Sequence, residues 1–537
     1  MHQKFALMIA ALLLTVGATH ASPRQQDNPH QWWNERVFYE VFVRSFNDSD
    51  GDGIGDLQGL IDKLDYLNDG DPSTTDDLGV TGLWLMPVAE APSYHGYDAT
   101  DYRQIEQDYG TNEDFRELMA AAHERGIVVI VDLVLNHTSN QHEWFTASAA
   151  GDPEYADWYI WQDNVPRGQQ GWHLLNGRYY YGAFSETQPE LNLANPDVTA
   201  ELYDVARFWL QDMGVDGFRL DAIKHLIEEN GAGENSDETH AWLQGFHAYV
   251  ESVNPDALTV GEAWTSSYYA DDYVGGEVDI VFEFELASAM VASVQQGSRE
   301  TISAIAERTA RLYPPGQYAT FLTNHDQNRV NSELDGYIEA SKLAAALLLT
   351  SPGVPFIYYG EEIGMTGMRG AGTDAAVRTP MQWDDTPNTA GFTTGTAWQP
   401  ITDGYRLRNV AVESTDPDSL LSYYRQLIRL RNEHPALRHG DYLPVESSTR
   451  DVYAFVRHSD EETILVMMNM TEAPVSDYML TLEAGPLTDS HQPQLVFGAG
   501  ADVIPLGAND AGGFDEYRPL DTLPPQSMVG IQLADIN

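Results

Sequence analysis

Short apolar runs alternate with helix-favouring segments along most of this chain, and no other feature constrains its fold as strongly. The runs expected to form strands are Val37–Val43, Gly82–Met86, Ile127–Leu135, Val215–Leu220, Leu258–Val260, Val278–Phe282, Thr320–Thr323 and Val354–Tyr358. Segments with helical periodicity lie between them, including 112–125, 198–213, 239–253 and 339–350. Eight strands with crossovers predict an α/β fold, a closed (β/α)8 TIM barrel. The alternative is a doubly wound open sheet, but no glycine-rich phosphate loop follows any strand.

Two segments interrupt the alternation and predict further domains. The segment after the third strand is too long for a βα loop and is rich in Trp and Tyr, which predicts an inserted domain. Near the C-terminus the pattern changes to short alternating strands, which predicts an antiparallel β-sandwich. The expected domains are the barrel, formed by 22–137 and 196–435, the inserted domain 138–195 and the C-terminal domain 436–537.

The N-terminus is typical of an exported protein. Lys4 precedes the apolar run Phe5–Leu14, and small residues flank a cleavage point after Ala21. This pattern predicts a signal peptide over residues 1–21 and a secreted or periplasmic location. The run is too short to span a bilayer, and no later run reaches ~18 apolar residues, so no membrane association is expected. The absence of Cys excludes disulfides, thiolate nucleophiles and Cys-ligated metals.

The charge is strongly negative, with 29 Lys and Arg against 82 Asp and Glu and a formal net charge of −53. Nucleic acids and anionic membranes carry the same sign, so neither is expected as a partner. Lysine occurs only at positions 4, 63, 224 and 342. A carboxylate-rich, lysine-poor surface keeps a protein hydrated in concentrated salt, which favours a halophilic protein over an ordinary acidic secreted one.

Four of the expected strands end on a carboxylate: Asp132, Asp221, Glu262 and Asp326. In a parallel barrel the carboxyl ends of the strands open on one face, so these groups should converge. Each could instead cap the following helix. Four together, with His and Arg in the same segments, favour acid/base and nucleophilic chemistry, above all glycoside hydrolysis.

The segments that carry these carboxylates resemble the motifs of the α-amylase superfamily, glycoside hydrolase family 13. They are DLVLNH (132–137), GFRLDAIKH (217–225), GEAW (261–264) and FLTNHD (321–326), and HGYDATDY (95–102), QPELNLANP (188–196) and GVPFIYYGEE (353–362) agree with them. The resemblance covers nearly the whole mature chain. It is strongest to the group between oligo-1,6-glucosidases and neopullulanases, which contains secreted α-amylases, including halophilic bacterial ones.

The resemblance implies a role for each strand-end residue. Asp221 would be the nucleophile, and Arg219 would keep it ionised. Glu262 would protonate the leaving oxygen and then activate water, which needs a raised pKa. Asp326 would bind sugar hydroxyls and distort the ring. Three further residues would hold the same sugar: His137 and His325 by hydrogen bonds and Tyr97 by stacking.

Residues near the nucleophile bear on specificity, again through the resemblance. Ala222 is small, whereas 1,6-specific relatives tend to carry Val at this position. Lys224 and His225 end the motif GFRLDAIKH in the way typical of α-amylases, in which these two residues contact the sugar beyond the cut bond. Against this, residues like Asp98 and Arg378 form an ion pair in exo-glucosidases that closes the cleft into a pocket.

These residues imply a monomeric, endo-acting, retaining α-amylase whose partners are starch and maltooligosaccharides. The alternatives are an exo-acting α-glucosidase or oligo-1,6-glucosidase, or a trehalose synthase-like transglycosylase. A catalytically inactive barrel used for binding would be expected to lack at least one of Asp221, Glu262 and Asp326, and all three are present.

The run DSDGDGIGD, residues 48–56, has oxygen ligands spaced as in a calcium loop. Carboxylates occupy positions 1, 3, 5 and 9, with a glycine at 6 and a backbone carbonyl at 7. Position 12 is Gly59 rather than Glu, so the loop is not an EF-hand; it matches a structural Ca²⁺ loop of the family. The expected ligands are Asp48, Asp50, Asp52, Ile54 and Asp56.

The net charge leads to a prediction about salt. Repulsion among the carboxylates opposes the compact state until counterions screen it, so the melting temperature should rise as NaCl increases into the molar range. Differential scanning calorimetry from 0.1 to about 3 M NaCl measures this, with sucrose at matched water activity as the uncharged control. A melting temperature that is flat or falls with NaCl would contradict halophilic adaptation.

Overall fold

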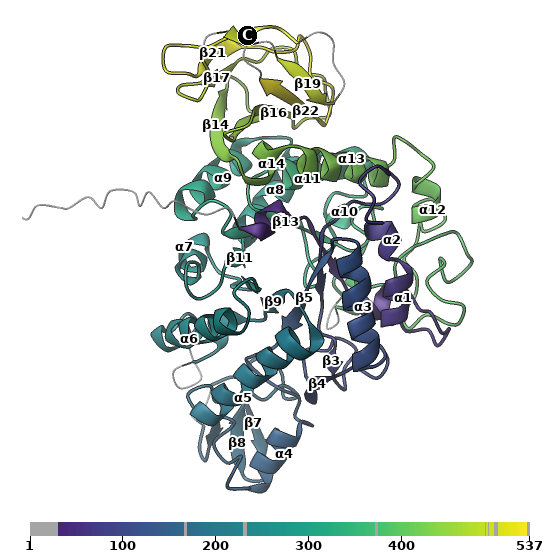
Figure 1. Cartoon of the computed structure of the whole chain (residues 1–537), viewed down its shortest axis with the longest axis vertical. Coiled ribbons are helices and arrows are strands. Elements are labelled where there is room, and N and C mark those ends of the chain that lie inside the picture. The colour runs from purple at the N-terminus through teal and green to yellow at the C-terminus, as the bar shows by residue number, and fades with distance from the viewer. Residues whose placement is uncertain are drawn as a thin grey trace, which may run out of the picture. The chain divides into compact units, whose positions relative to one another are not determined.

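Eight parallel strands close into a barrel in the computed structural model, as the sequence predicts (Figure 1). In chain order they are β1 (Phe38–Val41), β2 (Gly82–Leu85), β5 (Val128–Leu133), β9 (Gly217–Leu220), β10 (Leu258–Gly261), β11 (Ile280–Phe282), β12 (Tyr318–Thr320) and β13 (Val354–Tyr358). Each pairs with its neighbours in the chain order of the eight, and β13 closes the barrel by pairing with β1. The model describes residues 31–165, 169–228, 233–370, 374–488, 490–491, 493–498 and 503–533; the predicted signal peptide lies outside them.

One strand begins and ends earlier than predicted. The apolar run suggested Thr320–Thr323, but β12 covers Tyr318–Thr320. Its neighbour β11 is only three residues long and pairs with it at Tyr318 and Ala319, so the ladder ends early. Phe321 and Leu322 are buried by packing beyond the ladder. Burial, not strand pairing, therefore explains their apolar character.

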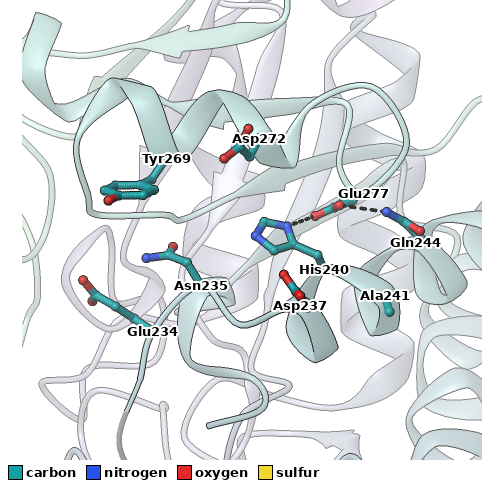
Figure 2. A pocket seen from close by; sticks show the side chains of 9 residues that line it. All are labelled: Glu234, Asn235, Asp237, His240, Ala241, Gln244, Tyr269, Asp272 and Glu277. Carbon is teal, nitrogen blue, oxygen red and sulfur yellow. Dashed lines mark hydrogen bonds and ion pairs between the residues drawn. The ribbon is translucent and has the colours of Figure 1, made fainter. Parts of the chain in front are cut away.

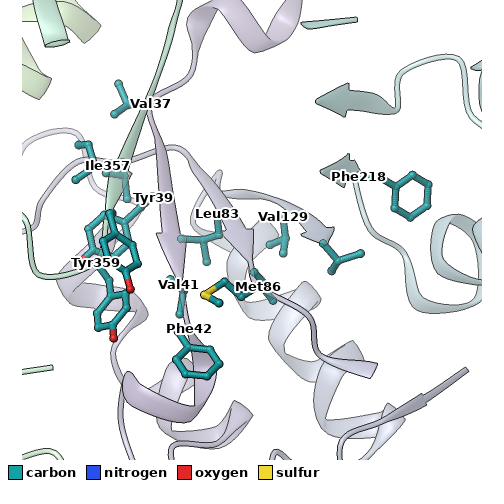
Figure 3. Packing of buried hydrophobic residues seen from close by; sticks show 14 of the residues in the cluster. Val37, Tyr39, Val41, Phe42, Leu83, Met86, Val129, Phe218, Ile357 and Tyr359 are labelled. Atoms are coloured by element: carbon teal, nitrogen blue, oxygen red, sulfur yellow. The ribbon is translucent and has the colours of Figure 1, made fainter. Parts of the chain in front are cut away.

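Side chains of the barrel strands alternate between two separate cores. Trp84 of β2 contacts Phe282 of β11 across the barrel, with ring centroids 5.2 Å apart, so these side chains point inward. The intervening residues, such as Leu83 and Val129, pack outward against the helices (Figure 3). This period of two follows from strand geometry. It places every second residue of each strand inside the barrel.

The same period carries polar residues to the carboxyl end of the barrel. Glu40 is two residues after the inward Phe38, Asp132 is two after Ile130, and Glu262 is two after Val260. Each strand therefore fills the barrel with an apolar residue and then presents a polar one above it. The layer of polar side chains follows directly from this register.

Gly217 permits the close approach of β9 and β10. Its φ is +155°, and an added Cβ would lie 2.0 Å from the backbone oxygen of Leu258, its register partner on β10. Any side chain there would push the two strands apart. These are the strands that lead to Asp221 and Glu262.

Helices cover the barrel at the positions where the sequence predicts them. Thr111 and Asp114 form a capping box at the start of α3, and Asn195 caps α5 with Pro196 in its first turn. Outside the inserted segment, the described helices of four or more residues are α1 (Leu57–Asp62), α2 (Leu64–Leu67), α3 (Asn112–Glu124), α5 (Pro196–Arg207), α6 (Asp237–Val253), α7 (Ser267–Ala270), α8 (Phe284–Gln296), α9 (Glu300–Leu312), α10 (Val330–Glu333), α11 (Ile338–Thr350), α12 (Val410–Glu413), α13 (Leu420–Glu433) and α14 (Pro435–His439), with a π-helical turn at Phe208–Met213 and a 3-10 turn at Trp32–Glu35. No helix in the described part of the chain has the length and hydropathy of a membrane span.

A small antiparallel sheet lies between the third and fourth barrel strands, β5 and β9. After α4 (Glu143–Ala150), the strands β6 (Trp161–Gln162), β7 (Trp172–Leu175) and β8 (Arg178–Tyr181) form an antiparallel sheet in the order β6-β8-β7. Phe145 of α4 stacks on Trp161 and meets Tyr180 edge-on at 5.0 Å. The aromatic residues of this segment therefore largely pack against one another. A hairpin of β3 (Ala89–Glu90) and β4 (Asp101–Ile105) precedes it.

The C-terminal part is antiparallel β structure. Seven strands pair in the order β19-β22-β16-β15-β14-β17-β21, and two short strands form a second pair. They are β14 (Asp441–Ser447), β15 (Val452–His458), β16 (Thr463–Asn469), β17 (Leu480–Leu482), β18 (Ser490–His491), β19 (Gln494–Phe497), β20 (Leu506–Gly507), β21 (Phe514–Tyr517) and β22 (Ser527–Leu533). The first five residues of β14 pair with β15 and its last two residues pair with β17. Side chains from both parts share one core, as expected of a sandwich.

Candidate active site

One buried guanidinium organises the carboxyl end of the barrel. Nη1 of Arg219 donates to Asp132 at 2.8 Å and to Asp221 at 2.6 Å, and Nη2 lies 3.0 Å from a carboxylate oxygen of Glu262. The Arg219 side chain is 1% exposed, whereas Asp221 and Glu262 are each 12% exposed. Three carboxylates from three strands therefore converge on one cation, and two of them remain open to a ligand.

Neither Asp221 nor Glu262 caps a helix; the carboxylate of Glu262 is instead held by the backbone that follows Asp221. Ala222, directly after Asp221, has a left-handed φ of +47°, and its backbone N–H donates to Oε2 of Glu262 at 2.9 Å. A non-glycine residue in this conformation costs on the order of 1 kcal/mol. The backbone turn after β9 thus positions the carboxylate after β10.

The environment raises the pKa of Glu262 to about 7. Burial is the largest cause and the nearby charges of Asp221 and Asp326 add to it, while Arg219 acts in the opposite direction. The pKa of Asp132 rises to about 6, also chiefly through burial. A carboxyl group with a pKa near 7 can donate a proton at neutral pH.

Asp326 has the opposite electrostatic environment. One oxygen accepts from Nη2 of Arg378 at 2.7 Å, and the other lies 3.3 Å from Nε2 of His325. Burial alone would raise its pKa, but His325 and Arg378 outweigh it and hold the pKa well below the ordinary value. Asp326 is therefore a permanent anion at the rim of the site.

Sequence analysis missed Glu40 as a site residue. Nδ1 of His325 hydrogen-bonds to Glu40 at the end of β1, and Nε2 of His325 contacts the Tyr97 hydroxyl at 2.7 Å. Tyr97 also donates to Asp132 at 2.9 Å and stacks on the His325 ring. Although burial lowers the pKa of His325, Asp326 and Glu40 raise it to about 9. The sequence signal that could have identified Glu40 is an acidic residue inside the apolar run that forms β1.

The inserted segment reaches the predicted residues His137 and His225. Nε2 of His137 is 3.1 Å from the Gln188 amide, and the ring of Phe184 contacts both histidine rings, at 5.3 and 5.5 Å. Phe184 is 48% exposed. His225 is further fixed by Glu228 at 2.7 Å. Phe184 and Gln188 were not singled out from sequence.

The remaining predicted site residues have identifiable partners. Nζ of Lys224 donates to the backbone oxygen of Trp264 at 2.9 Å and to Glu234. Asp98 accepts from the Ser93 hydroxyl. Among the described ion pairs, Arg378 contacts Asp326 and Asp374 but not Asp98.

The acidic loop brings three of its predicted ligands together. Carboxylate oxygens of Asp48, Asp50 and Asp56 lie within 4.8 Å of one another, a donor set that suits a hard cation such as Ca²⁺. Asp52 does not belong to this group; its Oδ1 accepts from the N–H of Ile54. Nearby Asp50 and Asp48 add to the effect of burial in raising the pKa of Asp52.

Comparison with known proteins identifies the family. The family model for the α-amylase catalytic domain matches residues 40–440, three quarters of the chain, from the end of β1 through the other seven barrel strands. The chain belongs to the α-amylase family. It is therefore an enzyme, a glycoside hydrolase of family 13, as its motifs imply.

Relatives within the family differ in named activity. The chain is 39% identical to α-amylase 3 of Dictyoglomus thermophilum, covering 82% of this chain and 85% of that protein. It is 35% identical to an oligo-1,6-glucosidase of Heyndrickxia coagulans (83% and 93% covered) and 36% identical to a trehalose synthase/amylase of Mycolicibacterium smegmatis (79% and 80% covered). The crystal structure of an α-amylase from H. orenii superposes with a TM-score of 0.80 at 38% identity, covering 93% of this chain and 99% of that chain.

Proposed function

We propose that this enzyme is a secreted, retaining α-amylase that cleaves internal α-1,4 bonds of starch and maltooligosaccharides. The observation that carries the proposal is that Arg219 holds Asp221 and Glu262 side by side, with the pKa of Glu262 raised to about 7. One anion and one protonated acid facing the same bond are the two groups that a retaining glycosidase needs.

In the proposed mechanism Asp221 attacks the anomeric carbon while Glu262 transfers its proton to the departing glycosidic oxygen. The C1–O bond to the leaving sugar breaks and a glycosyl ester with Asp221 forms. Glu262, now ionised, removes a proton from water, which attacks the same carbon and releases Asp221. Two inversions give net retention. Arg219 donates a hydrogen bond to Asp221 at 2.6 Å and holds its carboxylate in place for both steps.

The remaining residues are proposed to bind the sugar at the point of cleavage. Asp326, held ionised by Arg378 and His325, would accept sugar hydroxyls. His137, His325 and Tyr97 would surround the same ring. Lys224 and His225 would contact the sugar beyond the cut, and Asp98 would lie at the opposite end of the cleft.

The geometry around Arg378 favours endo action. A pocket closed for exo action would need Arg378 to pair with Asp98, whereas here Arg378 pairs with Asp326 and Asp374. Without an ion pair between Arg378 and Asp98 to close that side, a substrate chain could continue past it. The named activities of the relatives keep α-glucosidase, oligo-1,6-glucosidase and trehalose-forming transglycosylase as the alternatives.

Starch treated to a few per cent hydrolysis tests the endo proposal. We expect iodine staining and viscosity to collapse while mixed maltooligosaccharides appear. Maltose and isomaltose are the control substrates, since an α-glucosidase or oligo-1,6-glucosidase would cleave them readily. Release of glucose alone with persistent iodine staining, or trehalose formed from maltose, would contradict the proposal.

Neutralising either carboxyl group should abolish turnover without unfolding the protein. Asp221→Asn removes the nucleophile and Glu262→Gln removes the acid, so we expect kcat on starch to fall on the order of a thousandfold or more. The exposed Asp256 and Glu251 provide the matched controls Asp256→Asn and Glu251→Gln, which should retain wild-type kcat. Near-normal kcat in either active-site variant would disprove its role.

The raised pKa of Glu262 predicts an alkaline limit to activity. Raising the pH above about 7 ionises Glu262 and removes the proton that the leaving oxygen needs, so kcat/KM should fall roughly tenfold per pH unit. α-Maltosyl fluoride is the control substrate, because fluoride leaves without a proton. The activity of the enzyme on this substrate should therefore fall less at high pH than its activity on starch. A profile on starch that stays flat to pH 9 would contradict Glu262 as the acid.

We also propose that the acidic loop holds a structural Ca²⁺ through Asp48, Asp50 and Asp56, the three predicted ligands that lie together. Asp52, which lies outside this group, would have to turn toward the ion to join them, and the Ile54 carbonyl is the fifth predicted ligand. The cation would neutralise carboxylates that otherwise repel one another. The loop leads into α1, which Asp56 caps, so the ion would stabilise the segment that follows β1.

Removal of this ion should destabilise the protein. We expect EDTA to lower the melting temperature of the wild type. The variant Asp50→Ala should already melt at a lower temperature, and EDTA should not change its melting temperature further. Asp76→Ala, an exposed aspartate outside the loop, is the control and should respond to EDTA as wild type does. A wild-type melting curve unaffected by EDTA, in protein shown by metal analysis to contain no calcium, would contradict the site.

A further inference from the structure

Three buried hydroxyl groups hold the backbone on both sides of Arg378. The hydroxyl of Tyr358, the last residue of β13, donates to the carbonyl of the residue before Arg378 at 2.9 Å. The hydroxyl of Tyr359 donates to the carbonyl of the residue after Arg378 at 2.7 Å. The carbonyl of Arg378 itself accepts from the Ser45 hydroxyl at 2.6 Å. Three successive carbonyls are therefore fixed, and the three donors are fully buried.

This stretch of backbone carries the guanidinium that pairs with Asp326. Nη2 of Arg378 donates to Asp326 at 2.7 Å, and Nε of Arg378 donates to the backbone oxygen of His325 at 3.0 Å. The Arg378 side chain is 3% exposed, so it has little room to adjust. Because a planar guanidinium makes these two bonds in fixed directions, a shift of the backbone at 377–379 would weaken its contact with Asp326.

Arg329 lies against both tyrosines. Its guanidinium carbon is 4.4 Å from the centroid of the Tyr358 ring and 4.6 Å from that of the Tyr359 ring. Its Nη1 also donates to the backbone oxygen of Tyr359 at 2.6 Å. Arg329 is 2% exposed, and a buried cation is stabilised by the faces of aromatic rings. The contact fixes the directions in which the two tyrosine hydroxyls point.

These contacts form a closed circuit that begins and ends at Asp326. Arg329 is three residues after Asp326 in the chain and contacts Tyr358 and Tyr359. The tyrosines hold the backbone of Arg378, which returns to Asp326. Phenylalanine would fill the same space, whereas a buried hydroxyl needs an acceptor, and here both acceptors are next to Arg378. The circuit therefore links the core of the protein to one carboxylate of the site.

We propose that Arg329, Tyr358 and Tyr359 are positioning residues that hold the guanidinium of Arg378 against Asp326. They are buried and act on the reaction through Arg378, which sets the orientation of the Asp326 carboxylate. The inference rests on the proposed role of Asp326 in binding and distorting the sugar. It does not depend on whether the substrate chain is cut internally or from one end.

Removing one hydroxyl at a time tests the inference. Tyr358→Phe and Tyr359→Phe each keep the ring beside Arg329 but leave one carbonyl next to Arg378 without its donor. Since Asp326 is proposed to act mainly in the transition state, kcat on starch should fall about three- to tenfold in each variant while KM stays nearly unchanged. Arg329→Lys keeps the charge but loses the planar contact with both rings, so its kcat should fall in the same way.

Tyr478→Phe is the matched control. Tyr478 of the C-terminal domain is fully buried, and its hydroxyl donates to the backbone oxygen of Leu520 at 2.8 Å, so the variant loses the same kind of bond far from Asp326 in the chain. Its melting temperature should fall about as much as those of Tyr358→Phe and Tyr359→Phe, with wild-type kcat and KM. If those two variants also melted lower but kept wild-type kcat, their hydroxyls would only stabilise the core and the inference would be wrong.

A double-mutant cycle determines whether the tyrosines act through Arg378. Arg378→Lys keeps a cation beside Asp326 but cannot make both bonds of the guanidinium, so Tyr359→Phe should lower kcat much less in this background than in the wild type. The same loss of kcat in both backgrounds would contradict an effect through Arg378.

The outcomes distinguish this inference from the proposed function. If the wild type released only glucose from starch, the endo proposal would fail, and the same variants compared on maltose would still test the positioning role. If the wild type cleaved starch internally and both tyrosine variants kept its kcat, the positioning role would fail and the α-amylase proposal would stand.

Discussion

The active end of the barrel depends on one buried cation. Arg219 is almost fully enclosed, so its charge has to be compensated within the protein, and Asp132, Asp221 and Glu262 compensate it from three strands. Three carboxylates around one guanidinium leave net negative charge. Burial is the largest cause of the raised pKa of Glu262, and the charges of Asp221 and Asp326 add to it against the opposing effect of Arg219.

Barrel closure supplies this cluster with a rigid support. β5, β9 and β10 are adjacent, and their register sets Asp132 directly opposite Arg219 and aligns Gly261 with Leu220. On the other side of the barrel, Glu40 of β1 fixes His325, which in turn contacts Asp326 and Tyr97. The hydrogen bonds that position His325, Asp326 and Tyr97 thus begin at Glu40, a residue of the barrel strand β1.

Specificity depends on the segments between these strands. Phe184 from the inserted segment contacts His137 and His225, and the segments after β9 and β10 line a pocket whose wall includes Glu234, the partner of Lys224 (Figure 2). Relatives with amylase, oligo-1,6-glucosidase and trehalose synthase names match this chain over 79 to 83% of its length. The proposed choice among these activities therefore turns on Arg378 and other contacts outside the barrel core.

The sequence by itself determined the family, the eight strands and the strand-end carboxylates, because strand period and helix capping are local properties of the chain. It could not determine which charged side chains pair with one another. Glu40 and His325 are 285 positions apart, and Arg378 could have paired with Asp98 or Asp326 on sequence evidence alone. The end of β12 likewise depended on the length of its partner β11. These features depend on which strands and loops become neighbours, and closing the barrel decides that.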